Sequence, residues 1–321
     1  MSAAPTPAAE DALLAGWGNT AATRATVLHP TDADALAHAL DRPAPRGIIA
    51  RGLGRSYGDP AQNAGGLVVD VTGVTGIGPV DHERGVVTAV AGTSIDALIT
   101  HLVPQGWFVP VTPGTRQVTV GGAIASDVHG KDHHAVGSWG SALESIVLVT
   151  PAGGLEQVSP TRRRDLFWAT VGGMGLTGII VEATFRLHRI ESSLVSVDTD
   201  RTPDLDTTLD LMESGDHAYR YSVAWIDLVS HRRPPRSLGA RSGSLRHARP
   251  ARPGARTTAG VPQRHPGHVP RAHAGEPHPP AHGAGLQRGL VPQGSRRRRD
   301  RLQSISTFFH PLDMVDRWNR V

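Results

Sequence analysis

Cysteine is missing from the 321-residue sequence, which excludes a disulfide framework and a thiolate metal site. Long hydrophobic runs are missing as well, because none reaches the roughly 20 residues that span a bilayer. The first 15 residues lack the basic region and the apolar core of a secretory signal. We therefore expect neither a signal peptide nor a transmembrane segment, and the length suits one large or two modest domains.

Lysine is nearly missing, since Lys131 is the only lysine among 33 basic residues. Such arginine usage is typical of a G+C-rich coding sequence. Lys131 lies in a glycine-rich stretch, so two interpretations stay open: chance, or a requirement for an ammonium group at that position.

Acidic residues are scarce in one segment, and this scarcity explains the net charge of +4 and the sequence pI of about 10.2. Residues 1–230 contain 15 Arg or Lys against 25 Asp or Glu, whereas residues 231–300 contain 15 Arg against 2 acids. The high pI therefore does not indicate nucleic-acid binding by the whole chain. Residues 231–300 also have 11 Pro and 10 Gly but no Ile, Phe, Trp, Tyr or Met, too little apolar surface to offset the entropy of ordering.

Glycine and other small residues are concentrated between Gly114 and Gly140. Glycine lets a backbone approach a flat or charged ligand closely and adopt positive φ without strain. A wall without side chains beside proton-carrying groups is typical of a bound cofactor with chemistry at one edge. The histidines of this stretch lack the i, i+4 spacing of a helical zinc site, so no metal site is expected. The proton-carrying groups are His129, Lys131, Asp132, His133 and His134.

A second glycine-rich turn, Arg51 to Asp59, follows a short apolar run at Gly47 to Ala50 that we predict to be a strand. Successive backbone N–H groups in such a turn can bind an anion, and Arg51 and Arg55 add positive charge. The turn has neither the Gly-Lys-Ser/Thr of a Walker loop nor the spacing of a Rossmann fingerprint. A tight loop between two strands is the alternative interpretation.

The segment Gly173 to Gly178 matches G-x-G-x-x-G literally, but its context is wrong for a dinucleotide fingerprint. A predicted helix at 162–169 precedes it and a predicted strand at 179–187 follows it, the reverse of a Rossmann unit. We interpret it as a loop, and its backbone can still pack on a ligand. A helix is predicted from the N-cap Ser94 to Leu102, and further strands at 67–70, 86–90, 146–149, 155–158 and 219–228.

Four motifs together resemble the FAD-binding domain of the vanillyl-alcohol-oxidase (PCMH-type) superfamily: Arg51–Asp59, Pro113–Ala125, His129–Lys131 and Leu166–Gly173. Within that superfamily they are most similar to the decaprenylphosphoryl-β-D-ribose 2′-oxidases, the flavin half of an epimerase that makes arabinose donors for actinobacterial cell walls. The resemblance implies an α+β fold. A two-subdomain FAD-binding domain would precede an antiparallel-sheet substrate domain, which is incomplete here.

The resemblance also implies the residues of the site. FAD is expected as the cofactor, bound without a covalent link to the protein. The implied catalytic residues, beside the sugar and its phosphate, are His129, Lys131 and Tyr57. The implied cofactor-binding residues are Ala50, Arg51, Gly52, Leu53, Gly54, Arg55, Ser56, Tyr57, Gly58, Asp59, Pro60, Gly114, Thr119, Val120, Gly121, Gly122, Ser126, Asp127, Val128, His129 and Ile180.

The implied reaction oxidises the 2′-hydroxyl of the lipid-linked ribose to a ketone, with hydride transfer to the flavin while a base removes the hydroxyl proton. His129 is the expected proton carrier. Lys131 is expected to stabilise the substrate phosphate or the negative charge of the reduced flavin.

A polyprenyl-phosphate sugar substrate implies a keto-reductase partner and contact with a membrane surface, in the cytoplasm or at the cell envelope. No specific nucleic acid is expected as a partner. One alternative function is oxidation of another sugar alcohol or of an aldonolactone. A second is a non-catalytic binding protein whose basic segment holds nucleic acid or acidic lipid.

Five regions are expected along the chain. They are a disordered N-terminus (1–15), the FAD-binding domain (16–192), the start of a substrate domain (193–230), a segment that is disordered or out of frame (231–301), and a truncated remnant of the substrate domain (302–321). Relatives carry folded sequence in place of 231–301, which favours translation out of frame over a genuine basic insertion. Under that hypothesis the truncation impairs catalysis, and translation of the gene in its other two frames is the test.

Overall fold

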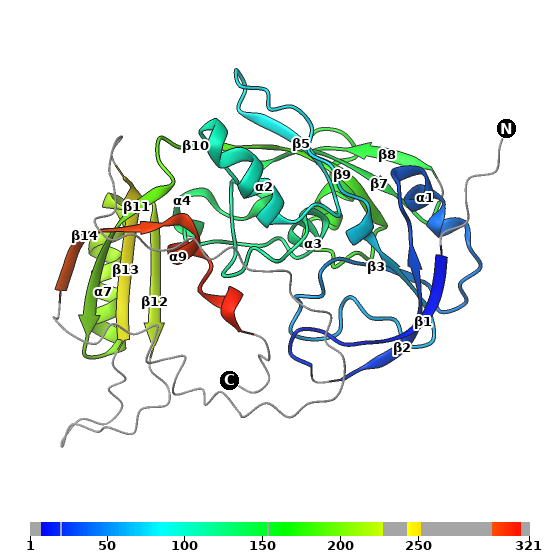
Figure 1. Ribbon diagram of the computed structural model, residues 1–321, viewed down its shortest axis with the longest axis horizontal. Helices are drawn as coiled ribbons and strands as arrows, with labels where there is room; N and C mark the ends of the chain where they lie inside the picture. Colours follow the sequence, from blue (N-terminus) through cyan, green and yellow to red (C-terminus); the bar gives the residue numbers. More distant parts are fainter. Residues whose placement is uncertain (1–7, 20, 153, 227–242, 252–296, 316–321) are drawn as a thin grey trace. The chain divides into compact units, whose positions relative to one another are not determined.

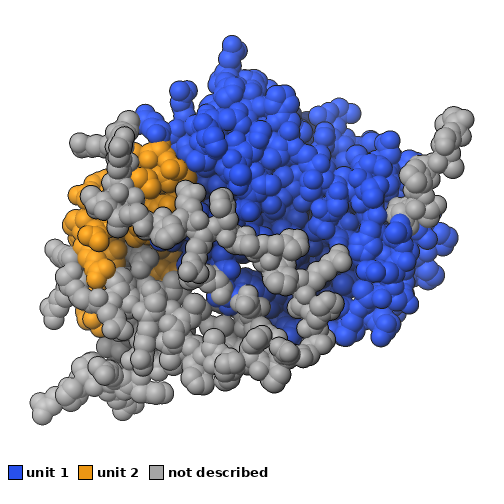
Figure 2. All heavy atoms as spheres, in the orientation of Figure 1, with its two compact units in different colours: residues 1–191, 306–319 blue, residues 192–305, 320–321 orange. Residues whose placement is uncertain are grey.

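The computed structural model describes residues 8–19, 21–152, 154–226, 243–251 and 297–315. The chain forms two compact units, coloured separately in Figure 2. Unit 1 contains residues 1–191 and 306–319, and unit 2 contains residues 192–305 and 320–321. The chain therefore leaves unit 1 after Glu191 and returns to it at Ser306.

The first sheet of unit 1 has the order β1-β2-β4-β3. Figure 1 labels β1, β2 and β3 of this sheet. Its strands are β1 (Ala8–Leu14), β2 (Thr23–His29), β3 (Ile48–Arg51) and β4 (Leu67–Asp70). Strand β4 pairs in parallel with both β2 and β3, and its two central valines are fully buried. A run of β-branched residues is the pattern expected of a strand covered on both faces.

Strand β1 corrects the expectation that residues 1–15 are disordered. All seven of its residues pair with β2, from Ala8 opposite His29 to Leu14 opposite Thr23. Its side chains are mostly exposed, so this edge strand shows no apolar alternation from which it could be predicted. Backbone pairing holds it, together with the packing of Ala12 and Leu14 on the core. Residues 1–7 lie outside the described residues.

The second sheet of unit 1 is antiparallel, with the order β5-β9-β7-β8. Its strands are β5 (Val86–Val90), β7 (Leu143–Val149), β8 (Leu155–Val158) and β9 (Ile179–Arg186), which lie side by side in Figure 1. A hydrophobic core links this sheet to the first one through helix α1 (Ala33–Ala37). The core includes Leu28, Leu36, Val69, Val149 and Ile179, with Ala50 packed at its border. It thereby fixes the start of the loop at 51–59 and the end of the loop at 173–178.

The remaining elements of unit 1 are short. Helix α2 (Ile95–Leu102) begins at Ser94, whose Oγ accepts a hydrogen bond from the Ala97 N–H at 3.1 Å, as predicted. No helix in the described residues is long and apolar enough to cross a bilayer. The other elements are α3 (Val120–Ala125), α4 (His133–Val136), α5 (Trp139–Ala142), α6 (Arg164–Thr170), η1 (His38–Asp41), η2 (Val71–Gly73), η3 (Val103–Gln105), and the pair β6 (Trp107–Phe108) and β10 (His188–Arg189).

Unit 2 is an antiparallel sheet with the order β12-β13-β11-β14. Its strands are β11 (Leu194–Thr202), β12 (Tyr221–Ile226), β13 (Gly243–Pro250) and β14 (Arg297–Ser304). Helix α7 (Leu205–Gly215) and the turn η4 (Asp216–Ala218) connect β11 to β12.

Strands β13 and β14 differ from the expectation of disorder over residues 231–301. Both pair with β11, whose Asp198 and Asp200 are buried. The Arg299 guanidinium lies 2.9 Å from the Asp200 carboxylate, and the Asp300 N–H donates to Asp198 at 2.7 Å. Backbone pairing and contacts to buried carboxylates therefore order these basic stretches, and composition alone does not reveal either. Residues 227–242 and 252–296 lie outside the described residues.

The end of the chain also corrects an expectation. Residues 302–321 were expected to be a remnant of the substrate domain, but residues 306–319 belong to unit 1. Here lie α9 (Ile305–Phe309) and the turn η5 (Pro311–Met314). Phe308 and Phe309 are buried, and the Phe309 ring lies 5.4 Å from that of Phe108 in β6. The Phe309 ring therefore packs against a residue of unit 1.

Candidate functional site

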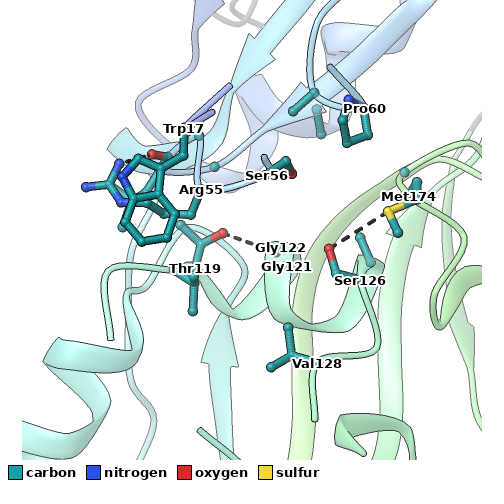
Figure 3. A pocket seen from close by; sticks show the side chains of 18 of the residues that line it. Trp17, Arg55, Ser56, Pro60, Thr119, Gly121, Gly122, Ser126, Val128 and Met174 are labelled. Carbon is teal, nitrogen blue, oxygen red and sulfur yellow. Dashed lines mark hydrogen bonds between the residues drawn. The ribbon is translucent and has the colours of Figure 1, made fainter. Parts of the chain in front are cut away.

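A cavity of about 470 Å³ lies where the glycine-rich segments of unit 1 meet. Eight of its 28 lining residues are glycine and four are alanine, so backbone forms much of the wall. In Figure 3, Trp17, Arg55, Ser56 and Pro60 lie on one side, opposite the segments that carry Thr119, Gly121, Gly122, Ser126, Val128 and Met174. Walls of this kind admit a long, flat ligand at close range.

The loop after β3 forms an anion-binding wall. In the described part of the chain, the backbone N–H groups of Leu53 to Ser56 donate to no other group of the protein. Gly54 has a φ of +66°, and a left-handed residue is typical of loops whose successive N–H groups converge on an anion. The Arg51 guanidinium holds the loop open from behind, since it donates to the carbonyl oxygens of Ala61 at 3.1 Å and Ala15 at 2.7 Å.

Arg55 is the one charged side chain among the described residues that line the cavity. Its Nη1 donates to the Leu53 carbonyl within the same loop at 2.6 Å. Burial lowers the pKa of Arg55, and the Asp313 carboxylate opposes this shift. A guanidinium that has lost part of its hydration gains from an anionic ligand, so the loop and Arg55 together suit a diphosphate.

Helix α3 forms a packed wall rather than a second anion site. Thr119 is its N-cap, with Oγ1 accepting from the Gly122 N–H at 3.1 Å. The N–H groups of Val120 and Gly121 already donate to Thr93 and Ala91 carbonyls. A Cβ on Gly121 would lie 3.0 Å from the Ala91 Cβ, so these small residues bring two backbones together at the cavity.

Tyr57 is the one predicted catalytic residue that lines the cavity. Its ring stacks on Trp17 with centroids 5.6 Å apart and an interplanar angle of 27°. Burial raises the pKa of Tyr57, so the phenol stays protonated at neutral pH. The hydroxyl group can therefore donate or accept a hydrogen bond there but does not act as a phenolate base.

His129 and Lys131 lie beside the cavity rather than on its wall. His129 follows the lining residue Val128, but its own side chain is exposed, with its ring 5.4 Å from that of His133. The Lys131 Nζ donates to the carbonyl oxygens of Phe308 and, at 3.2 Å, Phe309. It also lies 4.7 Å from the centroid of the Phe308 ring. The structure thus places the ammonium group against the end of α9.

Sixteen of the 21 predicted cofactor-binding residues line the cavity. Of the others, Arg51 braces the loop and Val120 is fully buried in α3. The Asp127 carboxylate accepts hydrogen bonds from the Ser138 hydroxyl and the Gly140 N–H. Asp59 and His129 are exposed and lie outside the lining set.

Twelve lining residues were not predicted. Three of them, Met174, Gly175 and Gly178, lie in the loop at 173–178, whose backbone was expected to be able to pack on a ligand. No local sequence pattern indicated Trp17 or Leu312, because they reach the cavity from distant parts of the sequence. The twelve are Trp17, Ala61, Val71, Ala91, Pro113, Thr115, Val118, Ala125, Met174, Gly175, Gly178 and Leu312.

Comparison with known proteins identifies the ligand class of the cavity. Residues 25–159 match the family described as FAD binding domain. The chain is 40% identical over 330 residues to the decaprenylphosphoryl-beta-D-ribose oxidase of Mycolicibacterium smegmatis, an alignment that covers 96% of this chain and 68% of that protein.

More distant relatives share a smaller part. An uncharacterized protein of Streptomyces coelicolor is 37% identical over 192 residues, 60% of this chain and 48% of that protein. A putative D-arabinono-1,4-lactone oxidase of Neurospora crassa is 29% identical over 149 residues, 46% of this chain and 26% of that protein. The chain thus spans about two thirds of the first relative's length and half or less of the other two.

The residues of the cavity fit FAD. The loop at 53–56 with Arg55 suits the diphosphate, and the walls at Gly121, Gly122 and Gly175 suit flat rings. The match over 25–159 confirms the expected cofactor. The chain belongs to the family of FAD-linked oxidoreductases with a PCMH-type FAD-binding domain.

Proposed function

We propose that the chain oxidises the 2′-hydroxyl of decaprenylphosphoryl-β-D-ribose to the 2′-keto sugar. The observation that carries this proposal is the 40% identity, over 96% of the chain, to an oxidase named for that substrate. The cavity supports it by providing a site for the required cofactor.

Bound FAD would supply the two-electron acceptor that alcohol oxidation needs. The loop at 53–56 and Arg55 hold the anionic part of the cofactor. Tyr57 offers a neutral hydroxyl at the cavity wall, which can orient a sugar hydroxyl. The exposed His129, next to the cavity-lining Val128, is our proposed carrier of the proton that leaves the 2′-hydroxyl.

Lys131 is proposed to bind the substrate phosphate. Its Nζ is hydrogen-bonded to the carbonyl oxygens of Phe308 and Phe309, so this role requires an exchange of those bonds for phosphate oxygens. The exchange is favourable in charge, because a phosphate is a stronger partner for an ammonium group than a neutral carbonyl.

The lipid substrate places the reaction at a membrane surface, and a keto-reductase is needed to complete an epimerisation. Both are part of the proposal. A second candidate function, oxidation of an aldonolactone, is favoured by the similarity to the putative arabinonolactone oxidase.

Anaerobic reduction of the bound flavin separates the two candidates. The full chain loaded with FAD is mixed with decaprenylphosphoryl ribose, D-arabinono-1,4-lactone or an alditol, and the flavin absorbance is followed. We expect bleaching by the lipid-linked ribose alone. Bleaching by the lactone, with none by the lipid-linked ribose, would replace the first candidate by the second.

A further inference from the structure

The segment at residues 306–315, here called the return segment, runs alongside the glycine-rich residues 112–116. His310 Nε2 and Thr112 Oγ1 are 2.9 Å apart, and the Leu312 N–H donates to the Gly114 carbonyl at 3.1 Å. The next pair in this series joins Asp313 to Thr115. These successive contacts link stretches that are nearly 200 residues apart in sequence, within unit 1.

Asp313 binds two residues of the glycine-rich stretch, Thr115 and Arg116. Its Oδ1 accepts from the Thr115 hydroxyl at 2.7 Å and from the Arg116 N–H at 3.2 Å, while its Oδ2 lies 2.9 Å from Arg116 Nε. The Arg116 side chain is only 16% exposed and also pairs with Asp96 at 3.2 Å. Charge-assisted bonds in such a partly buried position are stronger than exposed ones.

Leu312 connects the return segment to the cavity, because it lines the cavity wall. A Cβ added to Gly114 would lie 2.9 Å from Leu312 Cδ1, so the glycine is what lets the leucine approach. At its other end, the return segment is held by Lys131 through the carbonyl oxygens of Phe308 and Phe309.

We propose that the return segment positions one wall of the FAD cavity and that Asp313 is the positioning residue that holds it. Asp313 bonds to Thr115 and Arg116, follows the lining residue Leu312 in the chain, and its charge acts on Arg55, so its carboxylate influences the cavity through these neighbours. Loss of its carboxylate releases Leu312 and the 114–116 backbone from the wall and weakens retention of FAD. This inference depends on the FAD site and not on the identity of the sugar substrate.

The test is a titration of the FAD-free full chain with FAD, followed by flavin fluorescence. Asp313→Ala removes all three contacts and is expected to raise the Kd for FAD by about 10- to 100-fold. Asp313→Asn can keep both bonds to Oδ1 and loses the ion pair with Arg116, so a smaller increase is expected. The control is Asp165→Asn, an exposed acid in the first turn of α6, which is expected to bind FAD as the wild type does.

A positioning role also predicts effects that a loss of stability alone would not give. FAD bound to saturation in Asp313→Asn should show a shifted visible absorption band, because Leu312 has moved. The double variant Asp313→Asn/Arg116→Gln should lose no more affinity than the worse single variant, since the two residues act as a pair. An unchanged Kd in Asp313→Ala overturns the proposal. If that variant does not fold, an unchanged Kd and an unchanged spectrum in Asp313→Asn overturn it instead.

Discussion

At the scale of single residues, His310 has a strongly lowered pKa, and among the described residues it lies close to the site. It is 4% exposed, with Nε2 bonded to the Thr112 hydroxyl. Burial, aided by the charges of Arg116 and Lys131, lowers the pKa of His310 to about 3. The folded protein therefore keeps this imidazole neutral through the mildly acidic range. In the unfolded chain the same imidazole takes up a proton below the ordinary histidine pKa of 6.5.

Stability should consequently fall as the pH drops below about 6.5, by up to about 1.4 kcal/mol per pH unit from this residue alone. Above about pH 6.5 the stabilisation that comes from the neutral His310 imidazole is fully present. Replacing His310 with Gln, which can still reach the Thr112 hydroxyl, should flatten the dependence. The measurement is the thermal unfolding midpoint of both proteins between about pH 7.5 and about pH 5. Parallel curves for wild type and His310→Gln would show that the neutral imidazole has no such role.

Tyr57 gives a second prediction at this scale. Tyr57→Phe keeps the ring stacked on Trp17 and removes the hydroxyl from the cavity wall. FAD affinity should stay within about threefold, since one hydroxyl contributes little, whereas flavin reduction by the sugar should slow by about 10- to 100-fold. Stopped-flow reduction measures the rate, with Trp17→Phe as the variant that changes the ring partner instead. Equal reduction rates in Tyr57→Phe and wild type would exclude a role for the hydroxyl group.

At the scale of elements, α3 is the helix whose start forms part of the cavity. Thr119→Ala removes the N-cap and should cost about 1 kcal/mol of stability. Ser94→Ala removes the equivalent N-cap of α2, which does not line the cavity, and should cost a similar amount. We expect both variants to unfold at lower denaturant concentration, but only Thr119→Ala to bind FAD more weakly. Equal FAD affinities in the two variants would mean that the start of α3 does not shape the site.

Elements with a strong local pattern were predictable. The strands at 67–70 and 86–90 occur with the predicted bounds, because they are rich in β-branched residues. The strand at 155–158 also occurs with those bounds, because the turn at 151–154 pairs it with the preceding strand. Helix α3 was missed, since a six-residue helix with two glycines has low helix propensity and depends on its cap and its packing on Ala91. Strands β1 and β13 were missed because pairing with a neighbouring strand, rather than apolar alternation, defines them.

At the scale of the whole molecule, the site was predictable where it is built from contiguous motifs. The loop at 51–60 and the stretch at 119–128 carry their own glycine pattern, and most of their residues line the cavity. Leu312 and Asp313 were not predicted, because they reach it only after the chain has passed through unit 2. Local sequence patterns contain no information about such long-range returns.

At this scale we also keep the hypothesis that the basic segment, residues 231–301, is translated out of frame. Its composition differs sharply from that of both flanking regions, and strands β13 and β14 account for only part of it. Translation of the gene in its other two frames should yield substrate-domain sequence that resembles the relatives. If neither of the two other frames contains such sequence, a genuine basic insertion is favoured.

Every role assigned to the cavity of unit 1 requires that it holds FAD, and a titration of the purified full chain with FAD is the most direct test. We predict saturation at one FAD per chain, a visible flavin spectrum, and complete release of the flavin on acid precipitation, since we expect no covalent bond between the cofactor and the protein. A correctly folded chain that binds no FAD at any concentration tested would contradict these roles.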